Sequence, residues 1–165
     1  MAIRLTQATL VDLETLFEMM RHMQEVDPWS EPFYEPTLRA NLTELLANPV
    51  YGIVYIGLEQ SLPIAYLVIC FDYSLEFRGK GAWIDELFVE AAHRGKGIGT
   101  QLLDQAEAAS REHHAKFLHL ESHPRQPRRR TLPPPRLPRS PALPDVQTSR
   151  QVTSAVQIRG RSCLP

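Results

Sequence analysis

The chain has 165 residues, of which 43% are hydrophobic and 8% aromatic, and its formal net charge is −1. This length and composition fit one soluble globular domain with a sizeable core, and they exclude a chain too small or too polar to fold. The small net charge hides a division, because residues 1–121 hold nine basic and 18 acidic residues, whereas residues 122–165 hold nine arginines, nine prolines, one acidic residue and no aromatic residue.

We therefore expect two parts, a folded acidic domain over residues 1–121 and a Pro/Arg-rich disordered tail over residues 122–165 that cannot build a core. The two cysteines, Cys70 and Cys163, provide neither a disulfide framework nor the spacing of a zinc site. The longest apolar run, Ile64–Phe71, is too short to cross a bilayer, and the N-terminus has no stretch of signal-peptide type. These features predict a cytoplasmic protein that does not interact with a membrane.

The N-terminal half of the domain is predicted to form one strand and two helices. Ile3–Leu5 can begin a strand, and Thr9 followed by Asp12 is typical of a helix start. Apolar residues at helical spacing then predict a first amphipathic helix: Leu13, Leu16, Phe17, Met20 and Met23. Three prolines within residues 27–36 break this helix and predict a loop on the substrate side. A second amphipathic helix should end near Asn48, and its apolar positions are Leu38, Leu42, Leu45 and Leu46.

The second half of the domain is predicted to contain a hairpin, a long strand, a helix and a short strand. Residues 52–58 and 62–73 are rich in β-branched and aromatic side chains, and the short connection between them predicts an antiparallel hairpin. Trp83–Val89 predicts a third long strand, and a helix should run from Gly97 to about His113. The strand-like run Phe117–Leu120 then completes a strand-helix-strand unit, which makes it parallel to the Trp83–Val89 strand.

The turn between the long strand and the next helix is the most informative segment. Gly95, Gly97 and Gly99 stand at every second position, where the backbone can curl with its N–H groups pointing inward and no β-carbon blocks a ligand. Because the turn opens a helix, the helix dipole favours a phosphate there, and Arg94 and Lys96 add positive charge. The sequence therefore predicts an anion-binding turn.

Two better-known phosphate-binding loops do not fit this segment. A P-loop needs a Lys-Ser/Thr pair after four spacer residues, and the dinucleotide fingerprint needs glycine where Thr100 stands. A plain glycine-rich connection from strand to helix is the alternative. The preceding strand, the arginine and the amphipathic helix together favour a binding site.

The pattern Arg-x-x-Gly-x-Gly, from Arg94 to Gly99, resembles the coenzyme A pyrophosphate loop of the GNAT superfamily of acyl-CoA N-acyltransferases. The resemblance implies an α/β (mixed α+β) fold with a central, mostly antiparallel sheet and flanking helices. It also implies that the strand before the loop parts from the next strand and admits the pantetheine arm of acetyl-CoA, the co-substrate. The residues that would bind acetyl-CoA are Leu87, Phe88, Val89, Arg94, Gly95, Lys96, Gly97, Ile98, Gly99 and Thr100.

Two neighbouring carboxylates are the candidates for catalysis. An amine must be neutral to accept an acetyl group, yet an alkylamine of pKa about 10 is almost wholly protonated at neutral pH, so a proton acceptor is needed. If side chains alternate along the strand, Asp85 shares a face with Leu87, whereas Glu86 shares one with Ile84 and Phe88. We favour Asp85, as base or as amine anchor. The spacing leaves open that either carboxylate only pairs with a neighbouring cation, such as Arg78 or Lys80.

Acidic residues gather around Trp29, where members of the family select their acceptor: Glu25, Asp27, Glu31 and Glu35. Their charge would attract a cationic amine, and in this respect the chain resembles diamine and polyamine acetyltransferases. A solvated acidic surface is the alternative. The histidines lack the spacing of a metal site, so no metal is predicted: His93, His113, His114, His119 and His123.

The tail departs from the pattern of the family. A GNAT domain continues with a helix entered by Asn, a Tyr that can protonate the departing thiolate, a Gly-Phe pair and two strands, and none of these follows Ser122. All tyrosines precede the position of that acid: Tyr34, Tyr51, Tyr55, Tyr66 and Tyr73. The C-terminal part of the fold is therefore predicted to be missing or replaced.

One explanation is a shifted reading frame. Read one nucleotide out of phase, codons for the tail allow Asn or Ser at residues 126–127, Phe or Tyr at residues 132–133 and Leu-Gly-Phe over residues 135–138. The alternative is a genuine disordered arm, in which residues 133–138 form a polyproline II ligand or the arginines contact nucleic acid. Without interleaved aromatic residues, the pattern argues against nucleic acid as a partner.

The sequence thus predicts an N-acetyltransferase that moves an acetyl group from acetyl-CoA to a primary amine of a small cationic molecule or a protein, with activity impaired by the altered C-terminus. A homodimer is compatible with this prediction. The alternative is a catalytically weak or inactive remnant that only binds acyl-CoA.

Overall fold

The computed structural model of the protein describes residues 3–28 and 33–120. In these residues the elements follow the order β-α-α-β-β-β-α-β, with two short 3₁₀ turns. Their bounds are β1 Arg4–Gln7, η1 Leu10–Asp12, α1 Leu13–Val26, α2 Glu35–Ala47, β2 Gly52–Glu59, β3 Leu62–Ser74, β4 Gly79–Val89, η2 Ala91–His93, α3 Ile98–Glu112 and β5 Leu118–Leu120.

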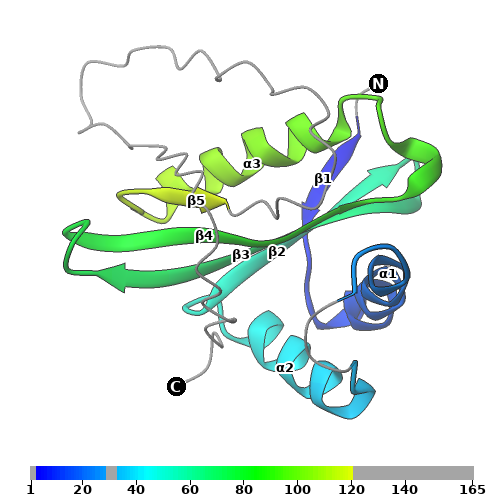
Figure 1. Ribbon diagram of the computed structural model, residues 1–165, viewed down its shortest axis with the longest axis horizontal. Coiled ribbons are helices and arrows are strands. Elements are labelled where there is room, and N and C mark those ends of the chain that lie inside the picture. Colours follow the sequence, from blue (N-terminus) through cyan, green and yellow to red (C-terminus); the bar gives the residue numbers. More distant parts are fainter. Residues whose placement is uncertain (1–2, 29–32, 121–165) are drawn as a thin grey trace.

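The described strands form one mixed sheet in the order β1-β2-β3-β4-β5. The first three pairs of neighbours are antiparallel, and β4 and β5 are parallel, as the strand-helix-strand order predicts. Figure 1 shows α3 covering one face of the sheet and α1 and α2 covering the other. The predicted fold class, a mixed α/β domain with a mostly antiparallel sheet and flanking helices, is confirmed for this part of the chain.

The core has two layers, one on each face of the sheet. On the side of α3, which we call the α3 face, Leu67 and Ile84 pack against the helix residues Ile98 and Leu102. On the opposite side, which we call the α1 face, the buried side chains belong to α1, α2 and the strands: Leu16, Met19, Met20, Leu42, Val54, Ile56, Tyr66, Val68, Cys70 and Phe88. This division assigns each strand residue near the glycine turn to one face.

The predicted helix start at Thr9 is confirmed with a small change. The Thr9 backbone N–H donates to Asp12 Oδ2 at 2.8 Å, which satisfies a donor at the start of the helical segment. The first turn is the 3₁₀ turn η1, and α1 begins directly after it. The predicted apolar face of α1 is also confirmed, because Leu16, Phe17 and Met20 are buried.

Strand β4 is longer than predicted, because it begins at Gly79 rather than at Trp83. The two glycines in its first three residues hide the strand signal, since glycine is depleted in strands. Gly81 lacks room for a side chain, because a β-carbon there would collide with the Phe117 ring and with Asp72. The glycine thus allows the chain before β5 to pack closely on β4.

Three predictions lie outside the described residues. These are the boundary of the domain at residue 121, the nature of the tail over residues 122–165, and the placement of Trp29 and Glu31. The shifted reading frame therefore stays a prediction.

Candidate active site

The glycine turn has the backbone that its spacing predicts. Gly95 has φ of 76° and Gly97 has φ of 82°, in the left-handed region where residues with a β-carbon are strained. Gly97 is the N-cap of α3. A β-carbon built at Gly95, Gly97 or Gly99 would meet no atom within 4 Å. The three glycines therefore border open space at the start of a helix of 15 residues, where backbone N–H groups and the helix dipole favour a phosphate.

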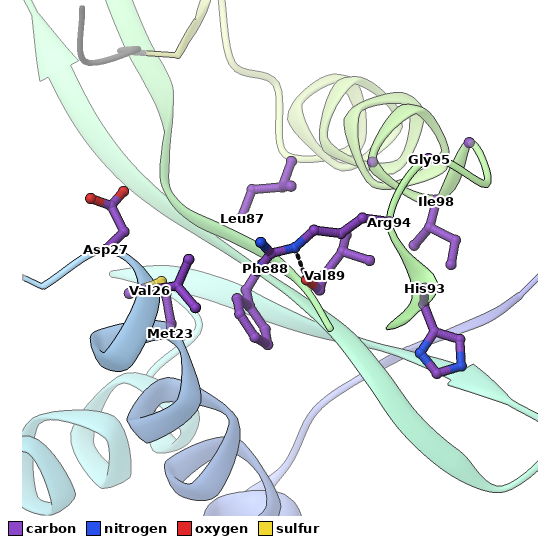
Figure 2. A pocket seen from close by; sticks show the side chains of 12 residues that line it. Met23, Val26, Asp27, Leu87, Phe88, Val89, His93, Arg94, Gly95 and Ile98 are labelled. Carbon is purple, nitrogen blue, oxygen red and sulfur yellow. Dashed lines mark hydrogen bonds between the residues drawn. The ribbon is translucent and has the colours of Figure 1, made fainter. Parts of the chain in front are cut away.

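A groove of about 370 Å³ extends from this turn to the end of α1. Figure 2 shows Met23, Val26 and Asp27 on one side of the groove, and Gly95 and Ile98 on the other. The end of β4 lies between them. The residues that line the groove are Met23, Val26, Asp27, Leu87, Phe88, Val89, His93, Arg94, Gly95, Gly97, Ile98 and Gly99.

Most of the predicted acetyl-CoA residues meet in this groove, and two do not line it. Leu87, Phe88 and Val89 belong to β4, and the others come from the turn that follows. Lys96 and Thr100 are exposed and lie outside the lining. The structure also adds Met23, which the helical spacing suggested only as a core residue, and Val26, which the sequence analysis did not single out.

Arg94 lies across the end of β4 rather than over the glycines. Its Nε donates a hydrogen bond of 2.8 Å to the carbonyl oxygen of Val89, and its guanidinium carbon lies 5.7 Å from the centre of the Phe88 ring. Figure 2 shows this arrangement, with the hydrogen bond drawn as a dashed line. Arg94 therefore supplies positive charge in the middle of the groove.

Near the groove, one edge of β4 has no strand partner in the part of the chain that the structure describes. Only Ala82–Ile84 of β4 pair with the described residues of β5. The backbone of Asp85–Val89 on that side has no strand partner among residues 3–28 and 33–120. The Val89 carbonyl oxygen accepts the hydrogen bond from Arg94, and other backbone groups along this edge can bind a ligand. This position agrees with the opening that the resemblance implies.

A β-bulge at Asp85 corrects the predicted alternation along β4. Val68 lies opposite Glu86, and the next residue of β3, Ile69, lies opposite Ile84, so Asp85 is an extra residue in the strand. Ile84 packs on the α3 face and Phe88 on the α1 face. The prediction that Glu86 shares a face with Ile84 was therefore wrong, because a bulge reverses the two-residue period.

The two carboxylates have different surroundings. Desolvation by neighbouring protein atoms raises the pKa of the Asp85 carboxyl. The Asp85 residue is nevertheless exposed in part. A proton taken up by Asp85 can therefore pass to solvent. Glu86 is half-buried and accepts a hydrogen bond of 2.8 Å from the hydroxyl of Tyr66.

Lys80 was one of the two cations suggested as partners of these carboxylates. The structure places its ammonium group against an aromatic ring instead. Its Nζ lies 3.7 Å from the centre of the Phe71 ring, and burial lowers the pKa of its ammonium group. Arg78 stands in the turn between β3 and β4, where its φ is 59°, at the end of β4 remote from the groove.

Two pairs of histidine and glutamate stand beside the groove. His22 Nδ1 lies 3.0 Å from Glu90 Oε1, which connects α1 to the residue after β4. The hydrogen bond to Glu90 raises the pKa of His22. A raised histidine pKa means that this contact stabilises the fold most at low pH and loses its effect as pH rises through that pKa. His93 Nε2 lies 3.0 Å from Glu59 Oε2 and holds the start of the glycine turn against the end of β2.

Among residues 3–28 and 33–120, no three His, Cys, Asp or Glu side chains come close enough together to hold a metal ion. No helix in the same ranges has the length and apolar character that a membrane span requires.

Comparison with known proteins agrees with this geometry. The sequence profile of the Acetyltransferase (GNAT) family matches residues 13–131. A search among curated proteins gave no match. Many solved structures share the fold, at sequence identities that support the fold alone.

Three of these structures illustrate the likeness. An integron cassette protein from the mobile metagenome of Cole Harbour Salt Marsh has a TM-score of 0.67 and 21% identity, over 85% of this chain and 91% of that one. A "possible acetyltransferase" from Clostridium difficile 630 has a TM-score of 0.66 and 16% identity, over 76% and 83% of the two chains. A predicted acetyltransferase from Clostridium acetobutylicum, solved with acetyl-CoA, has a TM-score of 0.63 and 24% identity, over 73% and 81%. The family match covers most of the chain, and the chain therefore belongs to the GNAT family of acetyltransferases.

Proposed function

We propose that the protein transfers an acetyl group from acetyl-CoA to a primary amine of a small cationic molecule or a protein. The observation that carries this proposal is the groove between the end of α1 and the glycine turn. The three glycines leave room for a phosphate group, and the edge of β4 beyond Ile84, which has no strand partner among the described residues, can bind the pantetheine arm. Use of acetyl-CoA is general in the family, and the C. acetobutylicum structure contains it.

The proposed reaction is direct transfer. The amine nitrogen attacks the carbonyl carbon of the thioester, the new C–N bond forms, and the C–S bond breaks to release the CoA thiolate. The amine must lose a proton to complete the transfer, and Asp85 accepts it. A carboxyl with a raised pKa is a better base than an ordinary surface carboxylate, and the pKa of Asp85 is raised by desolvation.

Departure of the CoA thiolate does not require the general-acid tyrosine that the pattern of the family places after residue 122. A thiolate of ordinary pKa about 8.5 leaves more readily than an alkoxide, so turnover persists at a reduced rate without a general acid. Tyr66 contacts Glu86, and it uses its hydroxyl proton in the hydrogen bond to that carboxylate. Tyr66 is therefore not a replacement acid.

The acceptor is proposed to be a diamine or polyamine, or a lysine-like amine on a peptide. Asp27 lines the groove beside the apolar side chains of Met23 and Val26, which suits an aliphatic chain with a positive end. Glu35 does not contribute, because its carboxylate binds Arg39 Nε at 2.8 Å. The acidic cluster is thus reduced, among the described residues, to Asp27 and the exposed Glu25.

We also propose that the protein is cytoplasmic and that it can form a homodimer. The absence of a disulfide framework in the sequence supports the first, because cytoplasmic thiols are kept reduced.

The test is an acetyl-transfer assay with the full chain, in which free CoA thiol is measured for a panel of amines. We expect saturable release of CoA with 1,4-diaminobutane or a polyamine, and a lower rate with neutral amines. Acetyl-CoA binding without release of CoA for any amine would replace the enzyme with the alternative, an inactive acyl-CoA-binding protein.

A further inference from the structure

A group of aromatic side chains lies where β5 meets the first half of β4, away from the glycine turn. Its members are Phe77, Trp83, Phe117 and His119, which contact one another ring to ring with centroid distances from 4.7 to 5.5 Å. We call this group the aromatic cluster. It is separate from the buried side chains of the two core layers. Figure 1 shows β5 beside the half of β4 that is remote from the groove.

The strand register places the aromatic cluster on the α1 face of the sheet. Trp83 lies opposite Cys70 of β3, which packs on the α1 face. His119 lies opposite Trp83, and its neighbour Leu118 packs on the α3 face, so the two-residue period turns His119 to the α1 face. The cluster therefore lies on the α1 face of the outermost two described strands.

The aromatic cluster is open to solvent on its outer side. Phe77 is 38% exposed, and Leu120, which follows the cluster on β5, is 49% exposed. Trp83 and His119 are half-buried. Strand β5 is the last strand in the sheet order, so its outer edge has no strand partner among the described residues. An exposed aromatic surface beside such an edge is typical of a binding surface.

The tail contains a segment with the composition that binds to aromatic surfaces. Residues 132–138 have the sequence Leu-Pro-Pro-Pro-Arg-Leu-Pro. Segments with two prolines three positions apart dock on aromatic side chains as a polyproline II helix, because this helix loses little conformational entropy on binding. Pro135 and Pro138 have this spacing. Arg136, between them, can lie over an aromatic ring and add a cation–π contact.

The length of chain between the two parts allows this segment to reach the cluster of the same molecule. The described residues end at Leu120, directly after His119 of the cluster, and Leu132 follows twelve residues later. Twelve residues span up to about 40 Å when extended. A tether of this length holds its segment at an effective concentration in the millimolar range, so weak contacts are enough for docking.

The charges of the two parts also favour contact. Residues 122–165 carry nine arginines and one acidic residue, whereas residues 1–121 carry nine basic and 18 acidic residues. Opposite net charges attract the tail to the domain. Glu76 and Arg78 flank Phe77, and both are exposed, so the attraction comes from the domain as a whole rather than from the turn.

We propose that residues 132–138 bind the aromatic cluster of their own chain as a polyproline II segment and cover the α1 face of β4 and β5 at the edge of the sheet. The proposal does not depend on acetyl transfer. Of the two explanations of the tail, it requires the genuine arm, and it assigns a receptor to that arm.

The first test is acrylamide quenching of Trp83 fluorescence in the full chain. Trp29→Phe leaves Trp83 as the single tryptophan. In this background, the double variant Pro135→Ser/Leu137→Ser removes apolar contacts of the segment. Because the docked segment covers the exposed part of the indole, the quenching constant should rise about twofold in the double variant.

The matched control is Leu143→Ser/Pro144→Ser, the same two changes further along the tail. It should leave the quenching constant of Trp83 unchanged. An equal constant in Pro135→Ser/Leu137→Ser and its background, or the same rise in both double variants, would overturn docking of residues 132–138.

The second test locates the segment with a nitroxide spin label. Cys163→Ser combined with Ser140→Cys leaves one accessible thiol, two residues after the segment, because Cys70 is buried. In the ¹⁵N-labelled full chain, we expect the label to broaden the indole N–H signal of Trp83 beyond detection. The amide signal of Gly97, at the other end of β4, should remain. Equal signals of Trp83 and Gly97 would overturn the proposal.

Two further samples show what occupies the cluster. Phe77→Ala should restore the Trp83 signal, whereas Leu75→Ala should not, because Leu75 is an exposed residue of the same turn outside the cluster. A mixture of spin-labelled chain without ¹⁵N and ¹⁵N-labelled chain without spin label should show no broadening. Broadening of Trp83 in this mixture would assign the surface to the tail of a second copy and overturn docking within one chain.

Discussion

Replacement of Asp85 by Asn is expected to lower kcat by about 10²- to 10⁴-fold, which is the usual contribution of a general base. The amide keeps the size and shape of the side chain but cannot accept the proton of the amine. In the wild type, kcat/KM should rise with pH through a pKa above the ordinary range of an aspartate, because desolvation raises the pKa of Asp85. This limb of the pH profile should disappear in Asp85→Asn.

The matched control is Asp72→Asn, the same change at an exposed position on the neighbouring strand β3. It should leave kcat and the pH profile unchanged. Binding of acetyl-CoA, measured separately, should be the same in both variants and in the wild type. If Asp85→Asn retains the kcat and pH profile of the wild type, the proton leaves by another route and Asp85 is not the base.

Replacement of Leu102 by Ala should have the largest effect on stability, with a loss of about 2–5 kcal/mol in the free energy of unfolding. Leu102 is fully buried on the α3 face, where it fixes the helix that carries the glycine turn. A cavity at this position leaves apolar atoms without contacts and loosens the start of α3. We therefore also expect weaker binding of acetyl-CoA in the part of the population that remains folded.

Urea unfolding followed by circular dichroism measures this loss. Leu103→Ala is the control, because Leu103 is only partly buried at the edge of the same cluster, and its loss should be about 1 kcal/mol. Equal losses for the two variants would contradict the account of how α3 is held on the sheet.

The sequence predicts the glycine turn well because the turn is a local structure. Residues with a β-carbon are strained at the φ values of Gly95 and Gly97, so the alternate glycines indicate the curl of the backbone directly. The strands and helices around the turn follow from short-range periodicity in the same way. Packing of Ile98 and Leu102 on the α3 face then places the turn at the end of β4.

The roles of the two carboxylates could not be predicted, because they depend on how β4 pairs with β3. The extra residue at Asp85 is visible only when Val68 is found opposite Glu86 and Ile69 opposite Ile84. Spacing within β4 gives a strict alternation and therefore the wrong faces. Tyr66 offered one signal that was missed, since a tyrosine inside an apolar strand needs a partner for its hydroxyl.

The acceptor side of the groove was also only partly predictable. Met23 and Val26 are apolar residues near the end of a helix, and their spacing cannot distinguish a core position from the wall of a groove. Their role depends on how α1 lies relative to β4, which is a long-range contact. Asp27 was included among the acidic candidates, and the structure places it in the groove lining.

The most direct test of the central claim is calorimetric titration of the full chain with acetyl-CoA, in the wild type and in Gly99→Trp. Gly99 lies in the first turn of α3 without the positive φ of Gly95 and Gly97, and its β-carbon would point into open space. An indole there should fill the groove without straining the backbone. Ala108→Trp places the same ring on an exposed position of the same helix and serves as the control.

We predict saturable binding by the wild type and by Ala108→Trp, and an affinity lower by roughly 100-fold or more in Gly99→Trp. Folding of each variant is checked by its circular dichroism spectrum. No binding by a folded wild type, or equal binding by Gly99→Trp, would contradict the assignment of the glycine turn as the acyl-CoA site.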